Sequence, residues 1–84
     1  MYQLHIDTVM HHVYSGLPPA ARATVARVLL DGLADPRQIG EPYGDVDDGL
    51  MRLYAADALA VVILIGNTTR RVTVLSLVWA GPSE

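Results

Sequence analysis

Cysteine is absent from this sequence. Its absence excludes a disulfide framework, a thiolate nucleophile and any zinc site built from cysteine ligands. Long apolar runs are absent too, since none reaches the roughly 18 residues that a helix needs to cross a bilayer. The first residues, "MYQLHIDTV", do not combine a basic segment with a long apolar one, which is the pattern of an export signal. We therefore expect a cytoplasmic protein without membrane contact.

Positive charge is also scarce. The chain carries a net charge of -3 at pH 7, and its six basic side chains are all arginine. These arginines are dispersed, and only Arg70 and Arg71 are adjacent. Contact with a nucleic-acid backbone normally needs several clustered cations. We therefore expect no strong direct binding to nucleic acid.

Apolar residues, in contrast, are abundant for so short a chain. The 84 residues are expected to form one domain, 1–84, which leaves roughly 40% of the surface of the unfolded chain exposed. Hydrophobic residues make up 51% of the sequence, and the mean hydropathy is +0.29. Part of this apolar surface is expected to be covered by a partner.

The N-terminal half is predicted to contain one strand and two helices. Residues 2–6, "YQLHI", alternate between apolar and polar side chains, which is typical of a half-buried strand. Asp7 is a suitable N-cap, and Gly16 a suitable stop, for a short helix. The apolar positions expected in this helix are Val9, Val13 and Leu17.

The second helix has the stronger pattern, in "LPPAARATVARVLLDGLADP". Pro18 and Pro19 favour its start, and Pro36 requires its end. Residues 37–49 are rich in Gly, Pro and Asp and are predicted to form a loop. The side chains expected on one face of this helix are Ala21, Val25, Val28 and Leu29.

Three strands are predicted in the C-terminal half, within "LMRLY", "ALAVVILI" and "VTVLSLVW". The connections at 55–57 and 66–69 are short, which favours an antiparallel meander. The last two strands show little polar alternation, so apolar groups lie on both of their faces. Two helices can cover one face of the sheet, and the second face needs a cover as well.

These strings, in this order, resemble the RelE/ParE superfamily of toxins from bacterial toxin–antitoxin modules. The resemblance rests on "YQLHI", "LPPAARATVARVLLDGLADPR", "GLMRL", "LAVVILI" and "RVTVL", and it spans nearly the whole chain. It implies an α+β fold of order β-α-α-β-β-β. In this fold the two N-terminal helices pack on one face of a small, mainly antiparallel sheet.

The resemblance also implies where the chemistry of the messenger-cleaving members would lie. In those members cationic, imidazole, phenol or carboxylate side chains on the concave sheet face hold the phosphate and transfer protons. Here the corresponding positions carry Ala60, Ser76, Trp79 and Ala80. We therefore predict no catalytic residue of the family's kind and no cofactor, and the interpretation as an enzyme stays open but is not favoured.

Five residues are candidates for binding a partner or a phosphate. Arg52 stands where the family often has a cation, and Tyr54 shares its strand face. Four of these candidates also have a plainer interpretation. Arg52 would be a solvent-facing strand residue, Arg70 and Arg71 would belong to a solvated turn, and Trp79 would pack in the core rather than anchor an interface.

No metal site is predicted. His11 and His12 are adjacent, so on a helix they diverge by about 100° and cannot chelate one ion as an i, i+4 pair would. Nothing in the sequence requires His5, on the first strand, to lie close to His11 and His12. The acidic stretch "DVDDG" at 45–49 lacks the register of a calcium loop and is interpreted as an acidic turn.

The leading hypothesis is therefore a RelE/ParE-like toxin-family protein of a toxin–antitoxin system that binds protein and does not cleave RNA. The expected partner is a cognate antitoxin, or a second copy associating through the last strands. The ribosome and gyrase are candidate targets. Three alternatives stay open: a ribosome-dependent mRNA endoribonuclease with a relocated site, a ParE-like gyrase inhibitor, and a decayed, non-toxic binding module.

Overall fold

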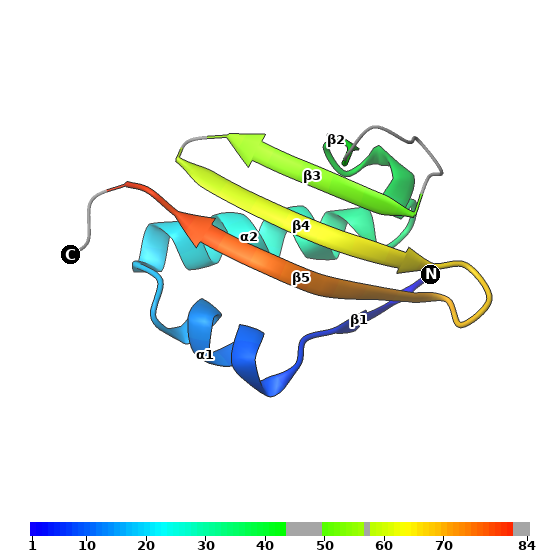
Figure 1. Cartoon of the computed structure of the whole chain (residues 1–84), viewed down its shortest axis with the longest axis horizontal. Coiled ribbons are helices and arrows are strands. Elements are labelled where there is room, and N and C mark those ends of the chain that lie inside the picture. The colour runs from blue at the N-terminus through cyan, green and yellow to red at the C-terminus, as the bar shows by residue number, and fades with distance from the viewer. Residues whose placement is uncertain (44–49, 57, 82–84) are drawn as a thin grey trace.

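A five-stranded sheet with both α-helices on one face forms the fold (Figure 1). The structure is a computed structural model, and it describes residues 1–43, 50–56 and 58–81. In Figure 1 the sheet lies in front and α2 crosses behind it. The elements are β1 (Gln3–His5), α1 (Thr8–Ser15), α2 (Pro19–Gly32), the 3-10 helix η1 (Pro36–Gln38), β2 (Glu41–Pro42), β3 (Met51–Ala56), β4 (Leu59–Gly66) and β5 (Arg71–Trp79).

The strand order in the sheet is β1-β5-β4-β3-β2, and only the β1–β5 pair is parallel. The predicted α+β class, the mainly antiparallel sheet and the helices on one face are therefore confirmed. The prediction of a plain loop over 37–49 was wrong in its first part, because η1 and the two-residue β2 lie there. The rest of that loop, including the acidic turn at 45–49, lies outside the described residues.

The short helix α1 begins and ends where the sequence predicts. The side chain of Asp7 accepts a hydrogen bond of 2.8 Å from the backbone N–H of Met10, and Gly16 is the C-cap. The prediction for Val9 was wrong, since its side chain is 66% exposed. Val13 contacts the core as expected, and Met10 and Tyr14 contact it in place of Val9, because positions i, i+3 and i+4 form one stripe of a helix.

Helix α2 provides the cover over one face of the sheet. Ala21, Val25 and Leu29, spaced by four residues, are buried, as the apolar pattern predicts. They lie in one core with the alternate residues Leu59, Val61, Ile63 and Ile65 of β4. Gly32 ends the helix, and a Cβ atom there would overlap with the side chain of Ile39 just after η1. Within the described residues, neither helix is long and apolar enough to cross a membrane.

A β-bulge in β5 explains why this strand lacks a simple alternation. The register with β4 shifts between Val62 and Ile63, so that Val62 pairs with Ser76 while Ile63 pairs with Val74. Leu75 is the extra residue. Because one extra residue reverses the alternation, Val74 and Leu77 both face the helices.

Candidate protein-binding face

The sheet has a second face that neither helix covers, and its composition follows from the strand register. Directly paired residues point to the same side of a sheet, so partners of the buried residues of β4 point to the helices and partners of the others point away. We call the outward-pointing set the open face. It comprises Gln3 and His5 of β1, Arg71, Thr73, Leu75, Ser76 and Val78 of β5, Ala60, Val62 and Leu64 of β4, Met51, Leu53 and Ala55 of β3, and Glu41 of β2.

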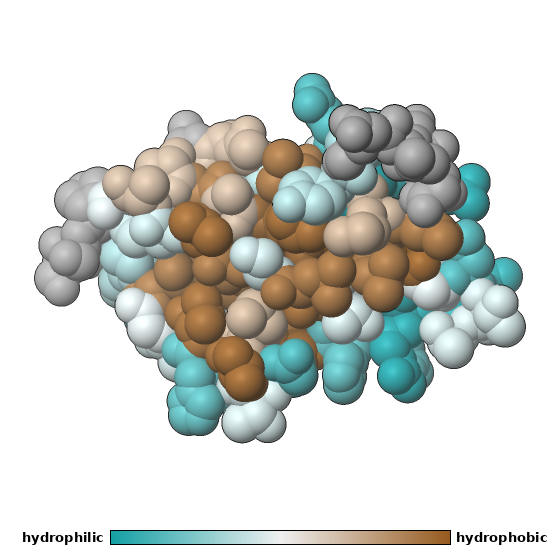
Figure 2. Space-filling view, viewed as in Figure 1, coloured by the Kyte–Doolittle hydropathy of each residue, from teal (hydrophilic) through white to brown (hydrophobic). Residues whose placement is uncertain are grey.

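The centre of the open face is apolar. Leu64, Leu75 and Val78 are 38%, 41% and 54% exposed. Figure 2, which looks onto this face, shows hydrophobic residues running along the middle of the sheet, with hydrophilic residues gathered near β1 and the β4–β5 turn. Contiguous apolar surface of this kind marks interaction sites in small proteins.

Two of the positions to which the resemblance assigns chemistry lie on this face. Ala60 pairs with Val78, and Ser76 pairs with Val62, on the neighbouring strands β4 and β5. The other two lie elsewhere, because Trp79 points to the helix side and Ala80 follows the end of β5. At these two positions of the open face the chain carries a methyl group and a hydroxyl group, neither of which is charged.

Arg52 and Tyr54 share a strand face, but it is the helix side of the sheet. They pair with the buried residues Ile63 and Val61 of β4. The guanidinium of Arg52 donates hydrogen bonds to the backbone carbonyls of Ile39, at 3.0 Å, and Gly40, at 2.8 Å. In this conformation Arg52 holds the connection between η1 and β2, and two of its donors are occupied.

Arg70 and Arg71 are adjacent but lie in different environments. Arg70 is in the β4–β5 turn with a φ of 54°, and its guanidinium lies 5.8 Å from the centroid of the Tyr2 ring. Tyr2 in turn donates a hydrogen bond of 3.0 Å to the side-chain oxygen of Asn67, in the same turn. Arg71 begins β5 on the open face, where it pairs with Gln3.

Trp79 lies on the helix side, at the end of β5. It pairs with Leu59 and contacts the core while staying partly exposed. With Leu59 and the first turns of α2 it lines a small cavity of about 140 Å³. A Cβ atom at Gly81 would overlap with the indole ring, so the chain leaving β5 passes directly over it. The side chain is thus placed at the border of the core, and not on the open face.

Two polar residues at the margins of the open face, His5 and Glu41, were not among the candidate site residues predicted from the sequence. His5 pairs with Thr73 beside Arg71 at the β1 margin, and Glu41 pairs with Leu53 at the β2 margin. The alternation of residues 2–6 does place His5 on the outward side of its strand. However, nothing in the sequence shows that β1 pairs with β5, or that β2 exists.

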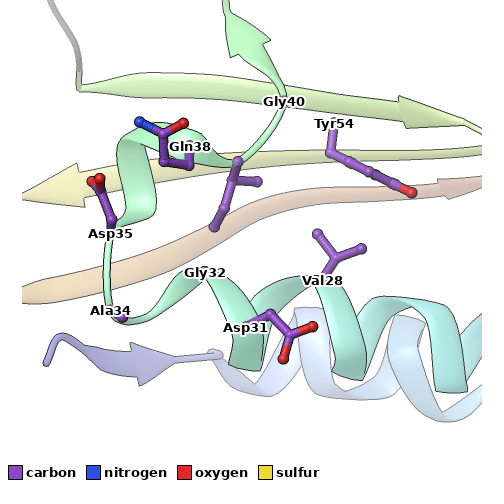
Figure 3. Close-up of a pocket in the computed structure, with 9 residues that line it drawn as sticks. Val28, Asp31, Gly32, Ala34, Asp35, Gln38, Gly40 and Tyr54 are labelled. Carbon is purple, nitrogen blue, oxygen red and sulfur yellow. The ribbon is translucent and has the colours of Figure 1, made fainter.

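A hollow on the helix side lies close to the C-terminal end of α2. A cavity of about 340 Å³ lies between the C-terminal end of α2, η1 and β3, and Figure 3 shows Tyr54 and Val28 facing each other across it. Asp31 and Asp35 lie at its exposed rim. Within the part of the chain that the structure describes, no three histidine or acidic side chains gather closely enough to hold a metal ion.

Comparison with solved structures finds the same fold in a bacterial toxin. The isolated E. coli RelE toxin, in its P21 crystal form, superposes with a TM-score of 0.79 at 21% sequence identity, over 100% of this chain and 89% of that chain. The intact E. coli RelBE toxin–antitoxin complex gives a TM-score of 0.78 at 19% identity, over 98% of this chain and 100% of that chain. No family model and no curated protein matches the sequence. The chain therefore has the RelE fold, as the resemblance predicts.

Proposed function

We propose that this chain acts as a toxin-family protein of a toxin–antitoxin system, by binding another protein and without cutting RNA. The observation that carries the proposal is the apolar open face, which includes Ala60 and Ser76, two residues at positions to which the resemblance assigns catalytic cations. The fold supports the first half of the proposal, because one of the similar structures is a toxin–antitoxin complex. Fold alone does not decide activity, so the second half depends on the side chains.

The test is to co-express the chain with the product of the neighbouring reading frame and to measure complex formation. We expect a stable complex that Leu64→Asp weakens by at least about 100-fold, because the substitution introduces a desolvated carboxylate into an apolar contact. Leu30→Asp is the matched control. Leu30 is 58% exposed on α2, away from the open face, and its variant should bind as the wild type does. No complex, or equal weakening by both variants, would overturn the proposed partner.

The second half of the proposal is tested on translating ribosomes. Purified protein is added to a defined translation system, and the 5′ ends of the messenger are mapped. We expect no new ends. Cleavage by the pure protein would overturn the proposal, whatever the binding experiment shows.

One observation favours a ribonuclease with a relocated site as the second candidate. His5 and Arg71 are diagonal neighbours on β1 and β5 of the open face, and diagonal pairs lie about 7–8 Å apart, within reach of long side chains. An imidazole and a guanidinium could move a proton and hold a phosphate, respectively. If the messenger is cut, His5→Ala and Arg71→Ala should each abolish the cutting under this second candidate, and Arg37→Ala, at an exposed site on η1, should not.

A further inference from the structure

We infer that two copies of this chain associate face to face through their open faces, about a two-fold axis that runs parallel to β4. This inference uses the protein by itself and does not depend on the proposed partner. It would explain how the apolar centre of the face is covered when no other protein is bound.

The charges of the open face are divided between its margins. His5 and Arg71 lie at the β1 margin and Glu41 lies at the β2 margin, on opposite sides of the apolar centre. All three side chains are exposed, and none of them forms an ion pair with another described residue. Arg52, the other arginine in a strand of the sheet, donates hydrogen bonds to backbone carbonyls on the helix side. The face is therefore positive at one margin and negative at the other.

A face of this kind is complementary to itself. A two-fold axis parallel to β4 turns one copy over the other, so that the β1 margin of each copy lies above the β2 margin of the other. Sheets that pack in this way lie about 10 Å apart with strands within about 30° of each other. Through the pairing, Glu41 is level with Val62 of β4 and His5 is level with Leu64. This offset of two residues, about 7 Å, is within the reach of the two side chains.

A hollow lies beside Glu41 at the β2 margin. It measures about 390 Å³ and is lined by Glu41, Leu53 and Ala55 of the open face together with Gly40 and Tyr54. A perpendicular two-fold axis would place the β1 margin of each copy above the β1 margin of the other, so His5 would not lie opposite Glu41. The charge pattern therefore selects the axis parallel to β4, along which Val62 and Leu64 meet the same residues of the second copy.

The size of the face predicts a reversible dimer. Four strands about 4.8 Å apart, and roughly six residues long, cover on the order of 400 Å² of flat surface. Stable interfaces bury about 800 Å² per partner. Because side chains project from the sheet, the accessible area of the face is larger than its flat area. It still lies at the lower end of the areas that stable interfaces bury. We expect a dissociation constant on the order of 10–100 μM.

Sedimentation equilibrium on the purified protein, from about 1 μM to about 1 mM, tests the inference. The wild type should change from monomer to dimer within this range. Leu64→Asp should raise the dissociation constant at least about 30-fold, because it opposes two carboxylates across the axis. Val78→Asp is a second variant for the case in which Leu64→Asp does not fold, and Leu30→Asp is the control that should dimerise normally. A wild type that stays monomeric at about 1 mM overturns the inference, as does a dimer insensitive to the open-face variants.

Charge exchange tests the direction of the axis. Glu41→Arg and His5→Glu should each raise the dissociation constant about 5- to 10-fold, because the first removes the acceptor opposite His5 and the second places two carboxylates opposite each other. The double variant restores opposite charges with the signs exchanged and should return to within about threefold of the wild type. Additive weakening in the double variant would overturn the parallel axis. Each variant is first checked for an unchanged circular dichroism spectrum and unfolding midpoint.

Discussion

At the scale of single residues, Gly40 and Arg52 together hold the segment between η1 and β3. Gly40 has a φ of 57°, and a Cβ atom there would overlap with the backbone carbonyl of Leu53. Arg52 donates to the carbonyls of Ile39 and Gly40 on the same segment. Arg52 is therefore a poor site at which to test ribonuclease activity, since its removal leaves two carbonyl groups without their donor.

We predict that Gly40→Ala lowers the free energy of unfolding by about 2–4 kcal/mol, from the positive φ and the overlap with the Leu53 carbonyl. Urea denaturation followed by circular dichroism measures the change. Gly16→Ala is the control, because Gly16 has a φ of -83° and its added methyl group would meet the nearest atoms at 3.6 Å. That variant should be neutral or up to about 1 kcal/mol more stable. Equal effects of the two substitutions would contradict the conformation described for Gly40.

At the scale of elements, the bulge of β5 decides which residues reach the core. An unbroken alternation that starts from the buried Val72 would point Ser76 inward and Leu77 outward. The register shift reverses this after Val74, so Leu77 is 7% exposed while Leu75 is 41% exposed. The bulge also gives the open face its leucine and serine side by side.

We predict that Leu77→Asn lowers the free energy of unfolding by about 3–5 kcal/mol, because it buries an amide among apolar side chains and removes packing. Leu75→Asn, on the exposed side of the same strand, should cost less than about 1 kcal/mol. Thermal unfolding of the two variants at equal concentration makes the comparison. Equal losses would mean that β5 has no bulge and that both leucines point the same way.

At the scale of the whole molecule, one face of the sheet is covered by helices and the other is not. Both faces of the sheet carry apolar side chains. These side chains account for the high mean hydropathy of +0.29 in so small a chain. The last strand pairs with β4 on one side and with β1 on the other, but β1 pairs only with Arg71–Thr73 at its start. The face-to-face association proposed above uses the outward side chains of the last strands and not the outer edge of β5.

We predict that Val78→Lys changes the free energy of unfolding by less than about 0.5 kcal/mol, because Val78 is 54% exposed. It should nevertheless lower the fluorescence of a bound apolar dye such as ANS and slow aggregation, since it places a charge on the apolar face. Leu30→Lys, at an equally exposed position on α2, should leave dye binding unchanged. A loss of stability above about 2 kcal/mol for Val78→Lys would show that the side chain is packed and not open.

The sequence by itself determined the local elements and the number of apolar faces. Asp7, Gly16 and the prolines around α2 act on their own neighbours, and the runs in β4 and β5 are apolar on both sides, so these features need no tertiary information. Only the tertiary structure decided which residues share the open face. The parallel pairing that brings His5 beside Arg71, the two-residue strand that carries Glu41, and the bulge after Val74 depend on contacts between residues far apart in the chain. The same contacts turned Arg52 toward the helices, because pairing with Ile63 decides its side of the sheet and no local pattern does.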